Sequence, residues 1–320
     1  MDKNSVRTCG IACGFAIIAA GILIGTLFIS ASKDEVDNEI QNLNEELKYS
    51  VFPIHQPEEL EFAGEKVPLG YFDVKEDLDR ELLINVYWQS HTMLLIKRAN
   101  RYFPVIESVL RKHGLPADLK YIAVAESDLT NSVSPDQAVG FWQFLDGTAK
   151  DYRLEVNDEV DERYHIERST EAACIFLKES YQRYGSWTMA AASYNMGRSG
   201  LEEQIGRQKT SYYYDLLLNE ETGRYVYRLL AMKLILSNPE EYGFYAEEKD
   251  LYPLIPTYEV TVDGTVEDFA DFASKYGINY KILKMFNPWL REKQLLNPQK
   301  QTYYIQIPKN GMDSRELSEF

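Results

Sequence analysis

Glu126 is the residue in this sequence whose type and spacing best fit acid–base chemistry. It follows Leu119, Ile122 and Ala123 at helical spacing, so a helix there places all four side chains on one face. Burial beside apolar neighbours raises the pKa of a carboxyl, because it disfavours the charged form. A carboxyl that is protonated near neutral pH can act as a general acid. The alternative is that Glu126 ends its helix and reaches water, as most glutamates do.

Two short patches elsewhere, and Ser127 directly after Glu126, carry polar side chains that suit the binding of a sugar. Gln143 lies in the aromatic-rich run from Ala138 to Phe144, and its amide both donates and accepts, which suits hydroxyl and acetamido groups. Tyr194 and Asn195 lie at the predicted end of a helix of small residues, where their polar tips are presented. Ser127 either hydrogen-bonds at this site or simply ends the helix that carries Glu126.

Cysteine and histidine spacing argues against a metal site or a disulfide framework. Of the three cysteines, Cys9 and Cys13 lie in or next to an N-terminal apolar run, which leaves Cys174 alone in the remaining chain. The four histidines are scattered and form no H-E-x-x-H pattern. No metal and no cofactor is therefore expected.

The charge balance excludes one large class of partners. The 320 residues carry a formal net charge of -16, so the phosphates of DNA or RNA would repel the chain. Hydrophobic residues make up 45% and charged residues 26%, as in an ordinary globular protein.

The N-terminus predicts a membrane anchor. Residues 11–29 are apolar or small and uncharged, which is just long enough to span a hydrocarbon core of about 30 Å. Lys3 and Arg7 precede the run and acidic residues follow it, so the main body is expected outside the cytoplasm, in the periplasm or cell envelope. A signal peptide cleaved after residues 30–32 is the main alternative. A lipoprotein fits less well, because the box ending at Cys13 precedes most of the apolar run.

The elements that must position these residues are predicted to be mainly α-helical. Between 78 and 237 the apolar residues recur at helical spacing, and no useful strand pattern appears. We expect one helix to open at Phe103-Pro104 and others at about 137–151, 169–184, 187–196, 198–206 and 221–237, the last with Thr222 as N-cap. The tail predicts a β-α-α-β unit. The expected divisions are an anchor (1–31), an acidic tether (32–76), a helical catalytic domain (77–238), a linker (239–257), the β-α-α-β module (258–308) and a tail (309–320).

The ordered motifs together resemble the catalytic domain of lytic transglycosylases, above all the membrane-bound type D group. They are Glu126-Ser127, the run Ala138 to Phe144, Ser193 to Gly197, and Glu221 to Val226. The resemblance implies a goose-type-lysozyme-like fold. It also implies cleavage of the β-1,4 bond between N-acetylmuramic acid and N-acetylglucosamine in peptidoglycan glycan strands.

The resemblance also implies roles for single residues. Glu126 matches the catalytic glutamate, and the substrate-binding positions match Ser127, Gln143, Tyr194, Asn195 and Tyr225. Two positions depart from the family pattern, because Gln137 and Ser193 replace a glycine and an alanine. The tail resembles a degenerate LysM module, which binds N-acetylglucosamine-containing glycans. Its usual glycine before the last strand is replaced by residues 298–301, so a purely structural role stays open.

The mechanism expected from these motifs uses one carboxylate. Ordinary glycosidases use two, whereas the resemblance assigns the catalytic role to Glu126 alone; Asp128 is two residues along a helix from Glu126 and would point elsewhere. Glu126 is expected first to protonate the glycosidic oxygen and then to deprotonate the muramic acid C6 hydroxyl, which closes a 1,6-anhydro ring. The alternatives are a hydrolytic muramidase and a non-catalytic wall-binding scaffold.

Overall fold

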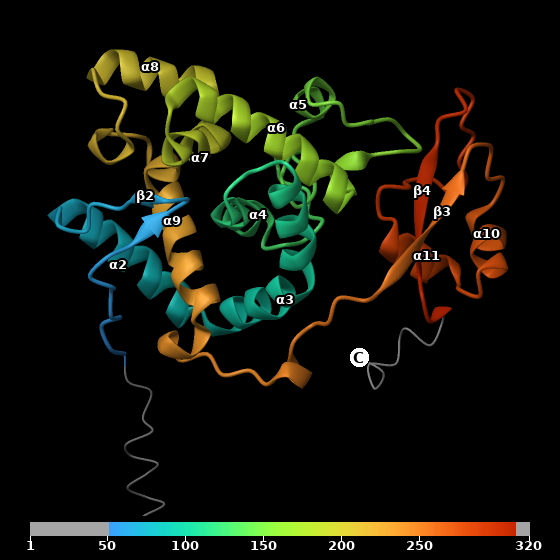
Figure 1. Cartoon of the computed structure of the whole chain (residues 1–320), viewed down its shortest axis with the longest axis horizontal. Helices are drawn as coiled ribbons and strands as arrows, with labels where there is room; N and C mark the ends of the chain where they lie inside the picture. Colours follow the sequence, from blue (N-terminus) through green and yellow to red (C-terminus); the bar gives the residue numbers. More distant parts are fainter. Residues whose placement is uncertain (1–50, 312–320) are drawn as a thin grey trace, which may run out of the picture. The chain divides into compact units, whose positions relative to one another are not determined.

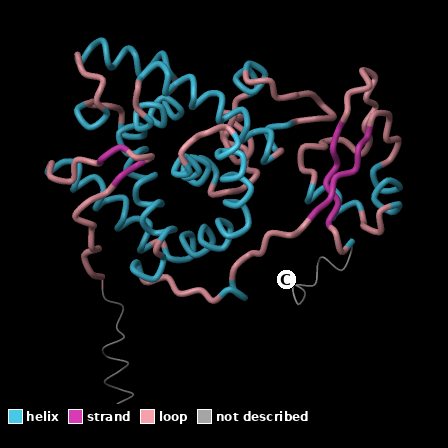
Figure 2. Tube along the Cα trace, in the orientation of Figure 1, coloured by secondary structure: helices cyan, strands magenta, loops and turns pink. Residues whose placement is uncertain are grey.

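Helices make up most of residues 51–311, the part of the chain that the computed structural model describes (Figures 1 and 2). They are α2 (Phe72–Tyr87), α3 (Gln89–Lys112), α4 (Lys120–Ser127), α5 (Asp146–Asp151), α6 (Ile166–Tyr184), α7 (Trp187–Met196), α8 (Arg198–Gln208), α9 (Glu220–Ser237), α10 (Phe269–Lys275) and α11 (Tyr280–Phe286). The strands are β1 (Glu61–Phe62), β2 (Glu65–Lys66), β3 (Thr257–Val262) and β4 (Tyr303–Pro308). Short 3-10 turns are η1 (Ala117–Leu119), η2 (Glu162–Tyr164), η3 (Tyr213–Asp215), η4 (Pro239–Tyr242) and η5 (Glu248–Asp250). The predicted mainly α fold is confirmed.

Two expected helix starts differ in the structure. Pro104 lies inside α3, so no helix opens there. A proline removes one backbone hydrogen bond, and the buried residues on both sides of it hold the helix together. The expected helix at 137–151 is confined to α5, because Gln137, Gly140 and Gln143 all have positive φ angles, which a right-handed helix excludes. Residues 139 and 144 pair as a tight antiparallel turn instead.

Side-chain caps begin the two helices that carry the predicted tyrosines. The Ser186 hydroxyl accepts from the Met189 N–H at the start of α7, at 3.2 Å. Asn219 Oδ1 accepts from the Thr222 N–H at the start of α9, at 2.8 Å. Thr222 was expected to be the cap; it is the third residue of the helix, and its own N–H is the group that is capped.

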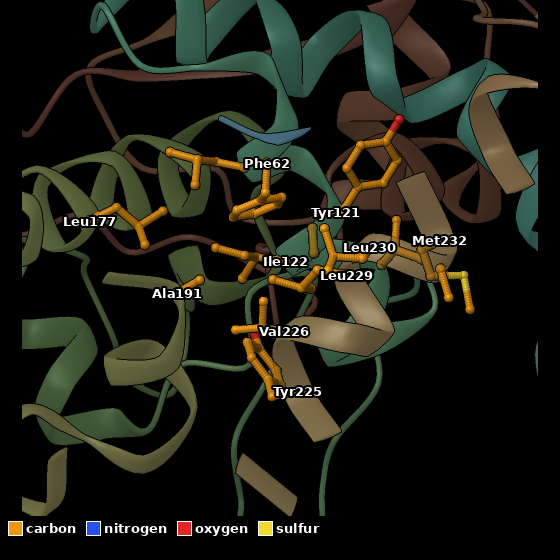
Figure 3. Packing of buried hydrophobic residues seen from close by; sticks show 14 of the residues in the cluster. Phe62, Tyr121, Ile122, Leu177, Ala191, Tyr225, Val226, Leu229, Leu230 and Met232 are labelled. Atoms are coloured by element: carbon orange, nitrogen blue, oxygen red, sulfur yellow. The ribbon is translucent and has the colours of Figure 1, made fainter. Parts of the chain in front are cut away.

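The main hydrophobic core surrounds α4. Ile122 of α4 is fully buried and lies among Leu229 and Leu230 of α9 (Figure 3). Phe62 of β1 is also fully buried and is drawn in the same cluster. This core holds α4, and with it Glu126, in a rigid setting.

Part of the expected tether belongs to the folded body. Leu60, Phe62 and Val67 are buried in the main core. Glu65 Oε2 accepts from Thr188 N at 3.0 Å and from Thr188 Oγ1 at 2.7 Å, and Glu65 Oε1 accepts from the Trp187 N–H, all in the first turn of α7. The tether prediction missed this because polar residues separate the buried positions. The body therefore begins before residue 77.

The expected linker, 239–257, is also held against the helices. Asn100 Nδ2 donates to the Tyr252 carbonyl and Arg101 Nε to the Pro253 carbonyl, both at 3.0 Å. Phe244 is buried in the main core. The segment is therefore anchored along α3, although its prolines and polar residues suggested a free connection.

The C-terminal part forms the β-α-α-β unit that the sequence predicted. β3 and β4 are antiparallel, in a register from Thr257 opposite Pro308 to Val262 opposite Tyr303. With α10 and α11 they enclose a second core, and Val160 from the loop between α5 and α6 is part of it. Within residues 51–311 no helix is long and apolar enough to cross a membrane. The anchor predicted at 11–29 lies outside the described residues.

Candidate functional site

Glu126 lies in the last turn of α4 and meets α9. Its side chain is half-buried, and the Tyr225 hydroxyl donates to Glu126 Oε1 at 2.6 Å. The two residues are far apart in sequence, and the packing of α4 against α9 brings them together. Glu126 is thus placed where burial and one strong hydrogen bond both act on its carboxyl.

The acidity of Glu126 departs strongly from that of an ordinary glutamate. Burial raises its pKa from 4.5 to about 7, and the charge of Glu221 adds to this rise. The hydrogen bond from Tyr225 and the charge of Arg228 act in the opposite direction, because both favour the ionised form. A carboxyl with this pKa exchanges its proton readily near neutral pH, as an acid–base group must.

Tyr194 and Tyr225 lie next to the carboxyl and stay protonated. Burial is the main cause that raises the pKa of both phenols, and the charge of Glu126 raises each further. The Tyr194 hydroxyl donates to the Trp142 carbonyl at 2.7 Å, whereas the Tyr225 hydroxyl donates to Glu126. The structure therefore brings three of the predicted residues, Glu126, Tyr194 and Tyr225, into one cluster.

Asn195 is held by the first turn of α9. Its Oδ1 accepts from the Thr222 hydroxyl at 2.8 Å, and its Nδ2 donates to Glu221 Oε1 at 3.3 Å. These bonds fix the orientation of the amide at the point where α7 ends and α9 begins.

Ser127 connects α4 to the loop that carries Gln143. Its hydroxyl is buried and lies 3.0 Å from the Ala123 carbonyl and 2.9 Å from the Phe141 carbonyl. The hydroxyl proton is thus engaged within the protein. This arrangement fixes the loop after the helix end and leaves only the oxygen lone pairs for a ligand.

Gln143 belongs to a tight loop, residues 137–144, which we call the site loop. The Gln143 amide nitrogen donates to the Gly140 carbonyl at 2.8 Å and to the Ser132 carbonyl at 3.1 Å. Gly140 has a φ of +82°, and a Cβ there would lie 2.0 Å from the Arg163 carbonyl oxygen. Only glycine permits this close approach of two backbone segments.

Asp128 points away from the cluster, as the sequence predicted. It ends α4 with a left-handed φ of 54°, and its carboxylate lies 3.0 Å from His91 Nε2. Asp128 therefore does not supply a second carboxylate beside Glu126.

Two charged residues beside Glu126 were given no role from the sequence. Glu221 and Arg228 both act on the Glu126 carboxyl. They precede and follow Tyr225 by four and three residues on α9, so helical spacing places all three on one face. That spacing is the signal that could have identified them.

A carboxylate of α2 contacts α9 next to the site. Glu81 is 1% exposed, and its Oε1 accepts from Arg224 Nε of α9 at 2.7 Å. Glu81 thereby fixes the first turns of α9, next to Tyr225. Its place on α2 gave no sequence signal, because its partner lies far along the chain.

Comparison with known proteins identifies two domain families in this chain. Residues 103–216 match the family described as the transglycosylase SLT domain. Residues 258–311 match the family described as the soluble lytic transglycosylase C-terminal LysM-like domain. The resemblance predicted from the sequence motifs is thus confirmed for both parts.

Two individual relatives match the chain at low identity. The membrane-bound lytic murein transglycosylase D of Escherichia coli (strain K12) is 26% identical over 263 residues, which cover 79% of this chain. A putative tributyltin chloride resistance protein of Alteromonas sp. (strain M-1) is 30% identical over 129 residues, which cover 40% of this chain. The matches cover 56% and 62% of the lengths of these relatives, so the chain spans little more than half of each. Residues 103–216 are therefore similar to transglycosylase SLT domains, and residues 258–311 are similar to the C-terminal LysM-like domain of soluble lytic transglycosylases.

Proposed function

We propose that this protein is a peptidoglycan lytic transglycosylase. It cleaves the β-1,4 bond between N-acetylmuramic acid and N-acetylglucosamine and leaves a 1,6-anhydro-N-acetylmuramic acid end. The observation that carries the proposal is the Glu126 carboxyl, which has a pKa of about 7, accepts a hydrogen bond from Tyr225 and lies within the residues that match the transglycosylase SLT domain.

Glu126 acts twice in the proposed reaction. In its protonated form it donates to the glycosidic oxygen as the bond to the muramic acid C1 breaks, and the N-acetylglucosamine hydroxyl leaves. The substrate's own acetamido group stabilises the positive charge at C1. The ionised Glu126 then takes the proton of the C6 hydroxyl, whose oxygen attacks C1 and closes the anhydro ring. Glu126 ends protonated, as it began, and no water is consumed.

A pKa of about 7 suits both steps, because neither proton state of Glu126 is strongly favoured near neutral pH. Tyr225 and Arg228 stabilise the ionised state that exists between the steps. Because the nucleophile is part of the substrate, the sugar must be held in position and water kept away. We assign this holding role to Tyr194, Asn195 and Gln143, and we assign to Ser127 the fixing of the site loop.

Hydrolysis is the competing reaction, and the presence of the Glu221 carboxylate near Glu126 favours it. Its exposed carboxylate acts on Glu126 across the start of α9, so it could activate a water molecule as a second carboxylate. Its Oε1 is engaged with Asn195, which favours a positioning role instead. The end groups decide between the two, because hydrolysis produces a reducing sugar and transglycosylation an anhydro sugar.

The test is mass spectrometry of the soluble products from purified peptidoglycan, with a zymogram as a first step. The wild type is expected to release anhydro-muropeptides. Glu126→Gln is expected to bind glycan and to lose about 10²–10⁴-fold in rate. Anhydro products at the normal rate from that variant would refute the role of Glu126. Reducing-end products from the wild type would show that the protein is a hydrolytic muramidase. The absence of any products would favour a non-catalytic wall-binding scaffold.

We also propose that the N-terminal segment holds the body at the membrane in the cell envelope. The support is the uncharged run at 11–29 and the name of the Escherichia coli relative. Cell fractionation tests this. The full chain is expected in the membrane fraction, and replacement of residues 1–31 by a cleavable secretion signal should release it.

A further inference from the structure

The loop between α5 and α6, residues 152–165, contacts the LysM-like module. Val160 is 1% exposed and packs inside the module's core, and it forms a β-bridge with Leu290. The backbone N–H of Asp161 donates to the Trp289 carbonyl at 2.9 Å, and that of Arg291 donates to the Glu159 carbonyl at 2.8 Å. A helical-domain loop thus completes the core of the module.

Side chains extend this contact on both sides of Val160. The Tyr303 hydroxyl of β4 donates to Glu155 Oε2 at 2.9 Å, and the Leu296 N–H donates to Glu159 Oε2 at 3.0 Å. His165 stacks on Trp289 with ring centroids 5.5 Å apart. The path of residues 155–165 is therefore fixed by the module over most of its length.

Arg163, in the same segment 152–165, also contacts the site loop. Arg163 makes a two-point ion pair with Asp161, with Nε to Oδ1 at 2.9 Å and Nη2 to Oδ2 at 2.8 Å. Its Nη1 points to the carbonyls of Gln137 at 3.4 Å and Phe144 at 3.3 Å, the two ends of the site loop. The Arg163 carbonyl lies against Gly140 in the middle of that loop.

We propose that the LysM-like module positions the site loop, with Asp161 and Arg163 as the positioning residues. The contacts form one continuous series from Trp289 through Asp161 and Arg163 to the loop that carries Gln143. Without the module, residues 155–165 would lose a buried anchor and would gain conformational freedom, which weakens every contact they make. This inference rests on the proposed function only where it concerns substrate binding.

The effect of the module should be confined to binding. Burial is the main cause that raises the pKa of Glu126, and the side chains that act on it by charge or hydrogen bond, Tyr225, Arg228 and Glu221, all lie on α9. Loss of the module contact should therefore raise KM and leave the pH dependence of kcat unchanged. A variant that merely unfolds part of the protein would lower the active fraction, and with it the apparent kcat, without this pattern.

Hydrogen–deuterium exchange of the full chain tests the coupling without any need for activity. Tyr303→Phe removes only the hydroxyl that binds Glu155. Tyr304→Phe is the matched control, because Tyr304 is the next residue of β4 and its side chain is 52% exposed. Val160→Ala removes the buried anchor and serves as the stronger variant. We expect faster exchange of the amides in residues 137–144, by about tenfold in Val160→Ala, which corresponds to roughly 1.4 kcal/mol. The increase should be smaller in Tyr303→Phe and absent in Tyr304→Phe.

The kinetic test uses Arg163→Lys on a soluble glycan oligomer. Lysine keeps the charge but cannot form the two-point pair with Asp161. We expect KM to rise about tenfold, equivalent to roughly 1.4 kcal/mol, with an unchanged pH profile. Unchanged exchange at 137–144 in Val160→Ala, or an unchanged KM in Arg163→Lys, would overturn the inference. An inactive wild type would overturn the proposed function instead, and the exchange result would still decide the coupling.

Discussion

The candidate site has two halves that are held in different ways. Glu126, Tyr194 and Tyr225 lie on helices α4, α7 and α9, which share the main core. Gln143 lies on the site loop, which forms no helix or named strand and is held by its own backbone hydrogen bonds and by Arg163. The helical half sets proton affinity through burial, whereas the loop half presents a polar side chain through backbone contacts. The comparison predicts that the proposed acid–base role and the proposed substrate-binding role can be altered separately in this molecule.

Gly140→Ala is expected to have the largest effect on the loop half. The added Cβ would lie 2.0 Å from the Arg163 carbonyl oxygen, at a residue with a φ of +82°. Overlap and backbone strain together are expected to cost roughly 2–4 kcal/mol of stability or to displace the loop. Urea unfolding and KM measure the two outcomes. Gly147→Ala is the control, because a Cβ there meets nothing within 4 Å. Equal behaviour of the two variants would contradict the packing described for the site loop.

The helical half makes a prediction about stability and pH. The folded pKa of Glu126, about 7, lies above its ordinary value of 4.5, so its protonated form stabilises the fold below pH 4.5. That contribution is lost as the pH rises through 7 and the buried carboxyl ionises. Glu126→Gln stays neutral. Its free energy of unfolding should therefore rise relative to that of the wild type by roughly 1–3 kcal/mol as the pH increases from 4.5 to 7.

Thermal or urea unfolding of the two proteins at a series of pH values measures this gain. A difference in stability that does not change with pH would show that Glu126 is not desolvated.

Tyr225→Phe tests the contact inside the helical half. The hydrogen bond from Tyr225 lowers the pKa of Glu126, so its removal should move the alkaline limb of the activity profile to higher pH. A hydrogen bond to a charged group contributes about 1.5–3 kcal/mol, so kcat should also fall when the ionised form is needed. Tyr227→Phe on the same helix is the control, since that ring packs with Tyr213 and Tyr214. A shift to lower pH in Tyr225→Phe would be the wrong sign for this account.

Glu221→Gln is expected to have the smallest effect. The charge of Glu221 raises the pKa of Glu126, so the alkaline limb should move to lower pH, by less at high ionic strength. Glu220→Gln should leave the limb in place, because that neighbour is exposed and pairs with Arg224. Anhydro products should persist in Glu221→Gln. Loss of all activity in this variant would assign it the second carboxylate of a hydrolytic mechanism.

The two halves also differ in how well the sequence predicts them. The helical spacing of Ile122, Ala123 and Glu126 predicts burial on one face, and the structure has that helix. Periodicity is a local signal that depends on few residues. The ordered motifs point to Tyr225 as well, although its contact with Glu126 spans 99 positions of sequence.

The loop half was harder to predict because its determinants are not local. Residues 137–145 were expected to be helical, and the positive φ angles of Gln137 and Gln143 have no clear signature in residues that are not glycine. Arg163, which donates to the site loop, lies in another segment of the chain. Phe62 is buried in the core, although the sequence predicted that its segment is a tether. Long-range contacts of this kind require the fold itself.

The central physical claim is that burial turns Glu126 into an acid that titrates near neutral pH. Carbon-13 NMR of the labelled glutamate carboxyls measures this directly, with Glu126→Gln to assign the signal. The account predicts that the Glu126 carboxyl titrates with a midpoint near 7 in the folded protein. A midpoint near the ordinary 4.5 would contradict it, because Glu126 would then be ionised throughout the neutral range and unable to donate the first proton.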